Sequence, residues 1–307
     1  MGPADMRENR QMSAMTVDIV FSLNRKIWLS LVVAMNSIVR NAAAPESIRF
    51  SILVPPGEKA FFEEKVKAGL PDISAQWRVQ EYLPPGFLRT YLDNRFKEKT
   101  EDRRNSRYIQ YSRFYFKDAL KDVEKMIYLD TDLLVLGDIA ELFAYTQQLN
   151  EQCYFGSVPH TYPCFLYFSN PFKMLKEIFQ FEQTFNAGVW FTDLSFWNDE
   201  TYDRLKYYLE LDAKNGYKLY TLGDEPVFNL MFKHYVQAPR NWNRCGYGSP
   251  PLVTRFLASG RKFLSQAKLI HWSGPYKPWN SPKIQFAPLW RTYVPEAIAP
   301  ELANAAN

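Results

Sequence analysis

The sequence predicts an α/β fold in which a mostly parallel sheet is flanked by helices. Short apolar runs of strand length alternate with longer amphipathic runs in the first half of the chain, and this alternation is typical of right-handed βαβ units. The chain has 307 residues, of which 47% are hydrophobic, so it can bury the core of one large domain or of two closely packed halves. It contains no run of about 18 uncharged apolar residues, which excludes a membrane-spanning helix.

The first half of the chain predicts four strands and three helices. The second strand is stopped by Pro55-Pro56-Gly57 and the second helix is closed by Gly69. After the third strand, Pro84-Pro85-Gly86 opens a segment that interrupts the pattern. Strands are expected over 17–23, 48–54, 77–83 and 125–129, and helices over 27–41, 58–68 and 108–121.

The second half is less regular and is rich in aromatic residues and proline. It predicts a smaller region of mixed strands and helices beside the parallel sheet. Strands are expected over 154–158, 188–192 and 268–271, and helices over 195–214 and 224–234.

Charge and cysteine content favour a cytoplasmic protein. The net charge of +4 is too small to indicate a nucleic-acid-binding protein. Three cysteines, an odd number without metal-ligand spacing, indicate a reducing compartment: Cys153, Cys164 and Cys245. Residues 1–15 predict a disordered tail, and they lack the apolar core of a secretory signal.

Residues 89–107 carry most of the excess positive charge. They hold seven basic and four acidic residues, which supplies +3 of the net +4. One interpretation is a solvated loop or helix. Another is a mobile lid over a site for anionic ligands, and a third is peripheral contact with an anionic inner membrane surface.

An Asp-x-Asp motif stands at the end of an expected strand. Asp130 and Asp132 are flanked on both sides by apolar residues, where unpaired carboxylates are costly to bury. A divalent cation between them would offset that cost, and Mg²⁺ and Mn²⁺ prefer such oxygen ligands. A polar turn between two strands, with helix-capping aspartates, is the alternative. A phosphatase with a nucleophilic aspartate fits less well, because Leu134 and Phe228 occupy positions where its motifs need other residues.

Five segments in fixed order resemble glycosyltransferase family 8, which includes glycogenin and bacterial lipopolysaccharide galactosyl- and glucosyltransferases. The resemblance covers roughly residues 17–279 and implies a GT-A-like fold. It is most specific in the last segment, where histidine, glycine and lysine precede Pro-Trp at the family's spacing. The segments are Tyr111-Ser112-Arg113, Tyr128-Leu129-Asp130-Thr131-Asp132, Phe185-Asn186-Ala187-Gly188-Val189, the run from Leu222 to Asn229, and the run from His271 to Trp279.

The resemblance implies a metal site and a site for the donor nucleotide sugar. Asp130, Asp132 and His271 would bind Mn²⁺, or Mg²⁺, against the donor diphosphate, and the imidazole favours Mn²⁺. Gly274 would let the backbone approach the diphosphate, while Lys277 would offer a positive charge to it. Pro278-Trp279 is expected to pack and fix the loop. The remaining donor-binding residues implied are Asn24, Arg113, Thr131, Asn186, Ala187 and Asp224.

The resemblance also implies two catalytic residues and an altered base pocket. Asp224 would lie beneath the donor sugar, and Glu225 would face the anomeric carbon as a nucleophile or as a stabiliser of positive charge. Most members carry glutamine at that position and retain the anomeric configuration. Asn24 and Ile27 stand where the family has residues that contact ribose and stack on uracil, so the stacking aromatic is missing unless Trp28 supplies it.

The predicted function is a metal-dependent, retaining transfer of a hexose from a nucleotide sugar, UDP-glucose or UDP-galactose, to a hydroxyl of a glycan or glycolipid in surface polysaccharide or lipopolysaccharide synthesis. Residues 16–160 would form the nucleotide-sugar-binding half and 161–307 the acceptor-side half. A non-catalytic nucleotide-sugar-binding protein and an autoglycosylating primer of the glycogenin kind remain alternatives.

Overall fold

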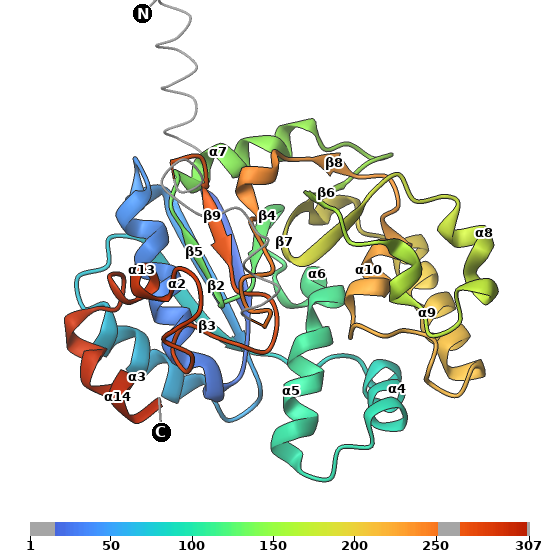
Figure 1. The fold of residues 1–307 in the computed structure, drawn as a ribbon, viewed down its shortest axis with the longest axis horizontal. Coiled ribbons are helices and arrows are strands. Elements are labelled where there is room, and N and C mark those ends of the chain that lie inside the picture. Colours follow the sequence, from blue (N-terminus) through green and yellow to red (C-terminus); the bar gives the residue numbers. More distant parts are fainter. Residues whose placement is uncertain (1–15, 251–264, 306–307) are drawn as a thin grey trace, which may run out of the picture.

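A central mixed sheet organises the computed structural model, which describes residues 16–250 and 265–305 (Figure 1). The predicted tail over 1–15 lies outside the described residues. The seven strands run in the order β3-β2-β1-β4-β7-β6-β8. They are β1 (Val17–Ser22), β2 (Ile48–Val54), β3 (Gln76–Glu81), β4 (Lys125–Leu129), β6 (Phe155–His160), β7 (Thr184–Asp193) and β8 (Val236–Gln237).

Parallel pairing is confined mainly to the first half of the chain. β3, β2, β1 and β4 are parallel neighbours, as the βαβ pattern predicts. β7 then runs antiparallel to both β4 and β6, and β8 lies parallel to β6. The predicted α/β class with a mostly parallel sheet is therefore confirmed, and the antiparallel pairs belong to the mixed second half.

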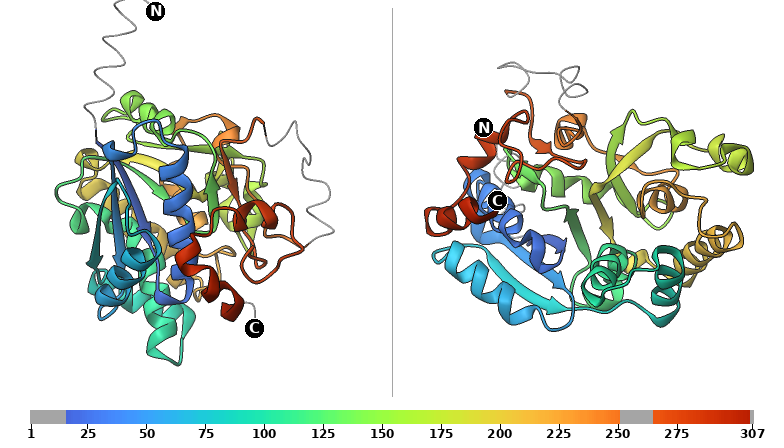
Figure 2. Two further views of the ribbon diagram at one scale, coloured as in Figure 1. Left: turned by 90° about the vertical axis from the view of Figure 1, so that its left-hand side faces the viewer. Right: turned by 60° about the horizontal axis from the view of Figure 1, so that its bottom comes forward.

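Helices cover both faces of the sheet (Figures 1 and 2). The core follows from the alternation of side chains along each strand: Ile19 and Phe21 of β1 pack with the α2 and α3 side, and Val20 between them faces the opposite core. Within the described residues, the α-helices are α2 (Trp28–Asn41), α3 (Lys59–Gly69), α4 (Gly86–Phe96), α5 (Glu101–Tyr111), α6 (Phe116–Ala119), α7 (Ile139–Phe143), α8 (Leu175–Ile178), α9 (Asp199–Lys214), α10 (Glu225–Met231), α13 (Ala287–Arg291) and α14 (Ala299–Ala305).

A second, two-stranded sheet lies on the other side of α2. β5 (Leu133–Val135) pairs antiparallel with β9 (Leu269–His271), and Leu133 lies opposite His271. Leu134 and Ile270 pack with α2 residues such as Val33 in a separate apolar cluster. Because α2 is covered from both sides, it is apolar nearly all round. The sequence did not predict β5, which is only three residues long.

Two expected elements are wrong in detail. The helix expected over 108–121 is divided into the end of α5, a 3₁₀ turn over Ser112–Tyr115 and the short α6. The interruption that starts at Pro84 contains α4 and most of α5. Thr100 starts α5 by accepting a hydrogen bond from the backbone N–H of Arg103, so the helix begins earlier than the apolar periodicity indicates.

Candidate active site

The Asp-x-Asp motif lies at the carboxyl end of β4, where the chain turns from the main sheet into β5. The backbone N–H of Asp130 donates to the carbonyl of Gly188 at 2.8 Å, which continues the β4–β7 pairing up to the motif. Tyr128 Oη donates to Asp130 Oδ1 at 2.7 Å. Asp132 enters the pairing of β5 with β9, since its carbonyl accepts from the backbone N–H of Trp272 at 2.8 Å. The carboxyl end of a parallel strand is thus the edge at which the two acids converge.

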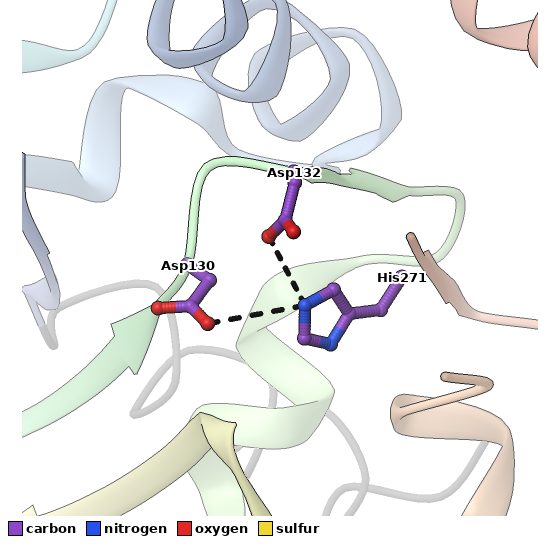
Figure 3. A group of neighbouring side chains, drawn as sticks. All are labelled: Asp130, Asp132 and His271. Carbon is purple, nitrogen blue, oxygen red and sulfur yellow. Dashed lines mark hydrogen bonds and ion pairs between the residues drawn. The ribbon is translucent and has the colours of Figure 1, made fainter. Parts of the chain in front are cut away.

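His271, at the end of β9, joins the two aspartates (Figure 3). Its Nε2 lies 3.0 Å from Asp132 Oδ1 and 3.9 Å from Asp130 Oδ2, and the side chain is almost fully buried. One ligand atom from each of the three residues lies within 4.8 Å of the others. The predicted grouping of these residues is therefore found in the folded chain, although they are far apart in sequence.

The orientation of the His271 ring is set by a chain of amides that the sequence did not predict. The backbone N–H of Gly188 donates to Asn186 Oδ1 at 3.1 Å, and Asn243 Nδ2 donates to the same oxygen at 3.3 Å. The amide oxygen of Asn243 therefore faces His271 Nδ1, at 3.2 Å. Because a carbonyl oxygen only accepts, Nδ1 of the ring carries a proton, and Nε2 faces the two aspartates.

Asp132 is held as an anion by two neighbouring positive groups. Burial opposes its ionisation, but the charges of His271 and Lys277 outweigh burial and lower the pKa of the carboxyl well below its usual value. Lys277 Nζ contacts Asp132 Oδ2 and also donates to the carbonyl of Trp272 at 2.9 Å. Lys277 thus lies directly beside the aspartate motif.

Arg113 connects the aspartate motif to the start of α10. It is buried in the 3₁₀ turn after α5, and its Nη1 lies 3.8 Å from Asp130 Oδ1 and donates to the carbonyl of Ala187 at 2.7 Å. Its Nε forms a 2.8 Å ion pair with Asp224 Oδ2. Burial raises the pKa of Asp224, and this ion pair partly opposes the increase. Gln110, which sequence reasoning missed, donates to Asp224 Oδ1 at 3.0 Å.

Glu225 is the first residue of α10, and three donors bind its carboxylate. Tyr167 Oη donates to Oε1 at 3.0 Å, while Asn186 Nδ2 and the backbone N–H of Ala187 donate to Oε2 at 2.8 and 3.2 Å. Burial nevertheless raises the pKa of Glu225 to about 7. Tyr167 was not a predicted residue, because nothing in the sequence places its turn beside α10.

A pocket of about 250 Å³ opens beside the Asp-x-Asp motif. Asn24 lies at its edge, accepting from the backbone N–H of Lys26 at 3.0 Å and donating to Ser106 Oγ at 2.6 Å. Thr131 is buried and accepts from Ser30 Oγ of α2 at 2.8 Å. The predicted residues that line the pocket are Asn24, Arg113, Asp130, Thr131, Asp132 and Lys277.

Two tryptophans considered in the sequence analysis, Trp28 and Trp279, differ in their position relative to this pocket. Trp28 is absent from the described lining and instead packs beneath the ammonium group of Lys65, 4.8 Å from its ring centre, so it does not replace the missing stacking aromatic. Trp279 packs on Trp290 as expected, but it also lines the pocket together with Ile27. Trp279 therefore adds an aromatic side chain to the pocket lining.

Two glycines are fixed by close contacts around the site. At Gly188 a Cβ would lie 2.4 Å from His271 Cε1 and 2.6 Å from Asp130 Oδ2. Gly274 has a φ of +120°, and a Cβ there would lie 2.5 Å from the carbonyl oxygen of Gly248. The conformation of its loop therefore requires a glycine at position 274.

The donor set fits a divalent metal ion. Two carboxylates and one imidazole offer convergent ligand atoms, and Gly188 leaves space beside them that any larger residue would fill. Lys277 and Arg113 lie at the margin of this cluster, where they could neutralise a bound anion.

Comparison with known proteins identifies the relatives of this chain. The model of glycosyl transferase family 8 matches residues 18–283. The chain belongs to glycosyltransferase family 8. The family is one of glycosyltransferases.

Curated relatives come from animals and plants. Glycosyltransferase 8 domain-containing protein 1 of Danio rerio is 30% identical over 211 residues, which cover 61% of this chain and 56% of that protein. The chain thus spans little more than half the length of that relative. Probable galacturonosyltransferase-like 7 of Arabidopsis thaliana is 28% identical over 277 residues, covering 86% of this chain and 70% of that protein.

Solved structures confirm the GT-A-like fold. A complex of the galactosyltransferase LgtC with donor and acceptor sugar analogs superposes with a TM-score of 0.68 at 19% identity, covering 94% of this chain and all of that one. The glycosyltransferase GlyE of Streptococcus pneumoniae TIGR4, in its apo form, superposes with a TM-score of 0.62 at 18% identity, covering 95% of this chain and 62% of that one. At these identities the likeness describes the fold.

Among residues 16–250 and 265–305, no helix combines the length and apolar character that crossing a membrane requires.

Proposed function

We propose that this enzyme transfers a hexose from UDP-glucose or UDP-galactose to a hydroxyl of a glycan or glycolipid acceptor. The transfer would retain the anomeric configuration and would serve the synthesis of a surface polysaccharide or lipopolysaccharide. The observation that carries the proposal is the convergence of Asp130, Asp132 and His271 at the edge of a pocket that also contains Arg113 and Lys277. A family 8 enzyme needs such a combination to hold a diphosphate. Its donor-binding half would comprise residues 16–160, and its acceptor side residues 161–307.

Asp130, Asp132 and His271 would hold the divalent ion, Mn²⁺ in preference to Mg²⁺ because of the imidazole. When bound, the ion would neutralise charge on the diphosphate. Lys277 would stay close to the phosphate oxygens through its bond to the Trp272 carbonyl and would stabilise the charge that develops on the leaving group.

Asp224 and Glu225 would act on the donor sugar. The ion pair with Arg113 and the bond from Gln110 fix Asp224, so that its carboxylate can accept from a sugar hydroxyl. Glu225 is held by three donors at the start of α10, which supports a role as a fixed carboxylate near the anomeric carbon. Attack from the same face, with the leaving phosphate oxygen taking the acceptor proton, remains the proposed route to retention.

Asn24, Thr131, Asn186, Ala187 and Gly274 would complete the donor site. Asn24 would hydrogen-bond the base or ribose from the pocket rim. Asn186 and Ala187 would border the sugar, because both contact Glu225.

The proposal is tested by release of nucleoside diphosphate from a panel of nucleotide sugars, first with Mn²⁺ and then with EDTA. Release from one uridine donor that stops in EDTA is expected. Asp130→Ala, Asp132→Ala and His271→Ala should each abolish that release. Asp203→Ala and His234→Ala are matched controls, because both side chains are more than two-thirds exposed on the surface, and they should keep wild-type rates.

Other outcomes identify the alternatives. Nucleotide binding that depends on Mn²⁺, without turnover on any acceptor, would indicate a binding protein. An increase in the mass of the protein itself by whole hexose units after incubation with donor would indicate an autoglycosylating primer. Wild-type rates in any of the three alanine variants would remove that residue from the metal site.

A further inference from the structure

The short helix α8 presents apolar side chains to solvent. It continues directly from a 3₁₀ turn over Pro171–Met174 and lies at the outer edge of the molecule (Figures 1 and 2). Phe172 is 82% exposed, Leu175 43% and Phe179 83%. Fully exposed phenylalanines are costly in water, so two of them within one helical stretch require a physical reason.

The apolar side chains of this stretch divide into exposed and buried ones. Phe172 lies in the 3₁₀ turn, Leu175 begins α8 and Phe179 directly follows the helix, and all three are exposed to solvent. Met174, between the first two, is buried in the protein core. The buried methionine therefore fastens the stretch to the protein, while the other three side chains face solvent.

Basic residues flank the outward apolar side. Lys173 and Lys176 are exposed, and Lys173 Nζ donates to the neutral Asn215 Oδ1 at 2.6 Å. The acid of this stretch, Glu177, is directed inward, where it pairs with Lys233 and accepts from Tyr208 Oη at 3.2 Å. The outward surface is consequently apolar and positively charged. We call Phe172, Lys173, Leu175, Lys176 and Phe179 the α8 surface.

The exposed apolar character extends from this region toward the candidate active site. Phe165 and Leu166, 50% and 43% exposed, immediately precede Tyr167, which donates to Glu225. Leu166 also accepts from Thr221 Oγ1 at 2.7 Å, and the next residue, Leu222, is 42% exposed. Exposed apolar side chains therefore also stand beside Tyr167, which contacts Glu225 of the candidate site.

We propose that the α8 surface docks on a lipid bilayer that contains anionic headgroups. The two phenylalanines would insert at the boundary between headgroups and acyl chains, and the two lysines would contact the anionic groups. The apolar side chains match the acyl-chain boundary of such a bilayer, and the lysines that border them match its anionic headgroups. A neutral protein partner would offer the lysines no opposite charge. This contact goes beyond the transfer reaction and requires no donor.

The basic segment over 89–107 is a weaker candidate for the same contact. Arg95 is buried in an ion pair with Asp212, and Arg107 pairs with Glu98 at 3.2 Å. Asp102 in the same segment pairs with Lys26 across the pocket rim. Part of the positive charge of this segment is therefore neutralised by ion pairs with acidic residues of the same chain.

Co-sedimentation of the full chain with vesicles tests the proposal. Wild-type protein is expected to bind vesicles of phosphatidylcholine with 30% phosphatidylglycerol, and to bind pure phosphatidylcholine at least tenfold more weakly. The double variant Phe172→Ser/Phe179→Ser should lose at least about tenfold in binding. Lys173→Gln/Lys176→Gln should lose about fivefold per lysine, and the loss should diminish at high salt.

Controls separate this result from folding and from the transfer reaction. Leu83→Ser removes another apolar side chain, 42% exposed, and should leave vesicle binding unchanged. All variants should keep wild-type hydrolysis of the donor in solution, so failure of the proposed transfer would not affect this test. The proposal is overturned if wild-type protein does not bind the anionic vesicles, or if the Phe172/Phe179 variant binds as wild type. It is equally overturned if sedimentation velocity shows a dimer that this variant abolishes in the absence of lipid.

Discussion

Replacing Glu225 by glutamine isolates the effect of its charge. The glutamine amide can keep every contact: its oxygen accepts from Asn186 Nδ2 and the Ala187 N–H, and its nitrogen donates to Tyr167 Oη. Tyr167 can then turn its own proton to the carbonyl of Phe185, which already lies 3.3 Å away. The substitution therefore removes a negative charge without leaving a donor or an acceptor unpaired.

The size of the effect follows from the pKa of Glu225. Burial raises that pKa from the usual 4.5 to about 7. Between these two pH values the folded protein retains a proton that the unfolded chain has released, so the free energy of unfolding falls as the pH rises. A difference of about 2.5 pH units corresponds to at most ~3.5 kcal/mol at about 1.4 kcal/mol per unit. Glutamine does not titrate, so the free energy of unfolding of Glu225→Gln should be close to that of wild type near pH 4.5 and should exceed it by up to ~3.5 kcal/mol above pH 7.

Urea unfolding at about pH 5 and about pH 8 measures this difference. Glu210→Gln, an exposed position on α9, is the matched control and should change stability by less than about 0.5 kcal/mol at both pH values. A stability difference between Glu225→Gln and wild type that is the same at both pH values would refute the reasoning, because it would show that Glu225 ionises normally in the folded protein.

Three further variants test other contacts of the site and its support. Asn243→Ala removes the acceptor that holds the proton on Nδ1 of His271, so Mn²⁺ affinity measured by calorimetry should fall about 10- to 100-fold; an unchanged affinity would contradict that role. Gly188→Ala places a Cβ 2.4 Å from His271 Cε1 and should also weaken Mn²⁺ binding, whereas wild-type affinity would show that the strand shifts freely. Asp212→Ala leaves Arg95 buried without its partner and should cost about 3–5 kcal/mol in urea unfolding. A cost below about 1 kcal/mol would show that the Arg95–Asp212 pair is exposed to water.

The predicted strands agree with the structure because their signal is local. β1, β2 and β4 are mainly apolar and largely buried, and such runs can be recognised without knowledge of their partner strands. β5 and the helix α4 were missed for a different reason. β5 is stable only because β9 pairs with it, and α4 has almost no apolar periodicity and is fixed by tertiary contacts such as the burial of Tyr91.

The residues of the candidate site likewise fall into those that a local sequence motif predicts and those that only tertiary contacts bring together. Asp130, Asp132 and His271 lie in recognisable motifs, and their convergence could be predicted through the family resemblance. Asn243 and Tyr167 have no motif. Their positions depend on loops that fold back onto β7 and α10, so only the three-dimensional arrangement connects them to His271 and Glu225. The roles and the division into two halves stay predictions.

The pairing of β5 with β9 has a consequence for the order in which the chain matures. Two of the three candidate ligands precede residue 133, but the third is supplied by β9, so a chain emerging from the ribosome cannot assemble the cluster until residue 271 has been made. An ion that binds only the assembled cluster stabilises by mass action only those molecules in which β9 has docked. The metal would then stabilise the docked position of β9. Chains that end before β9 would lack this stabilisation and would be degraded by proteases.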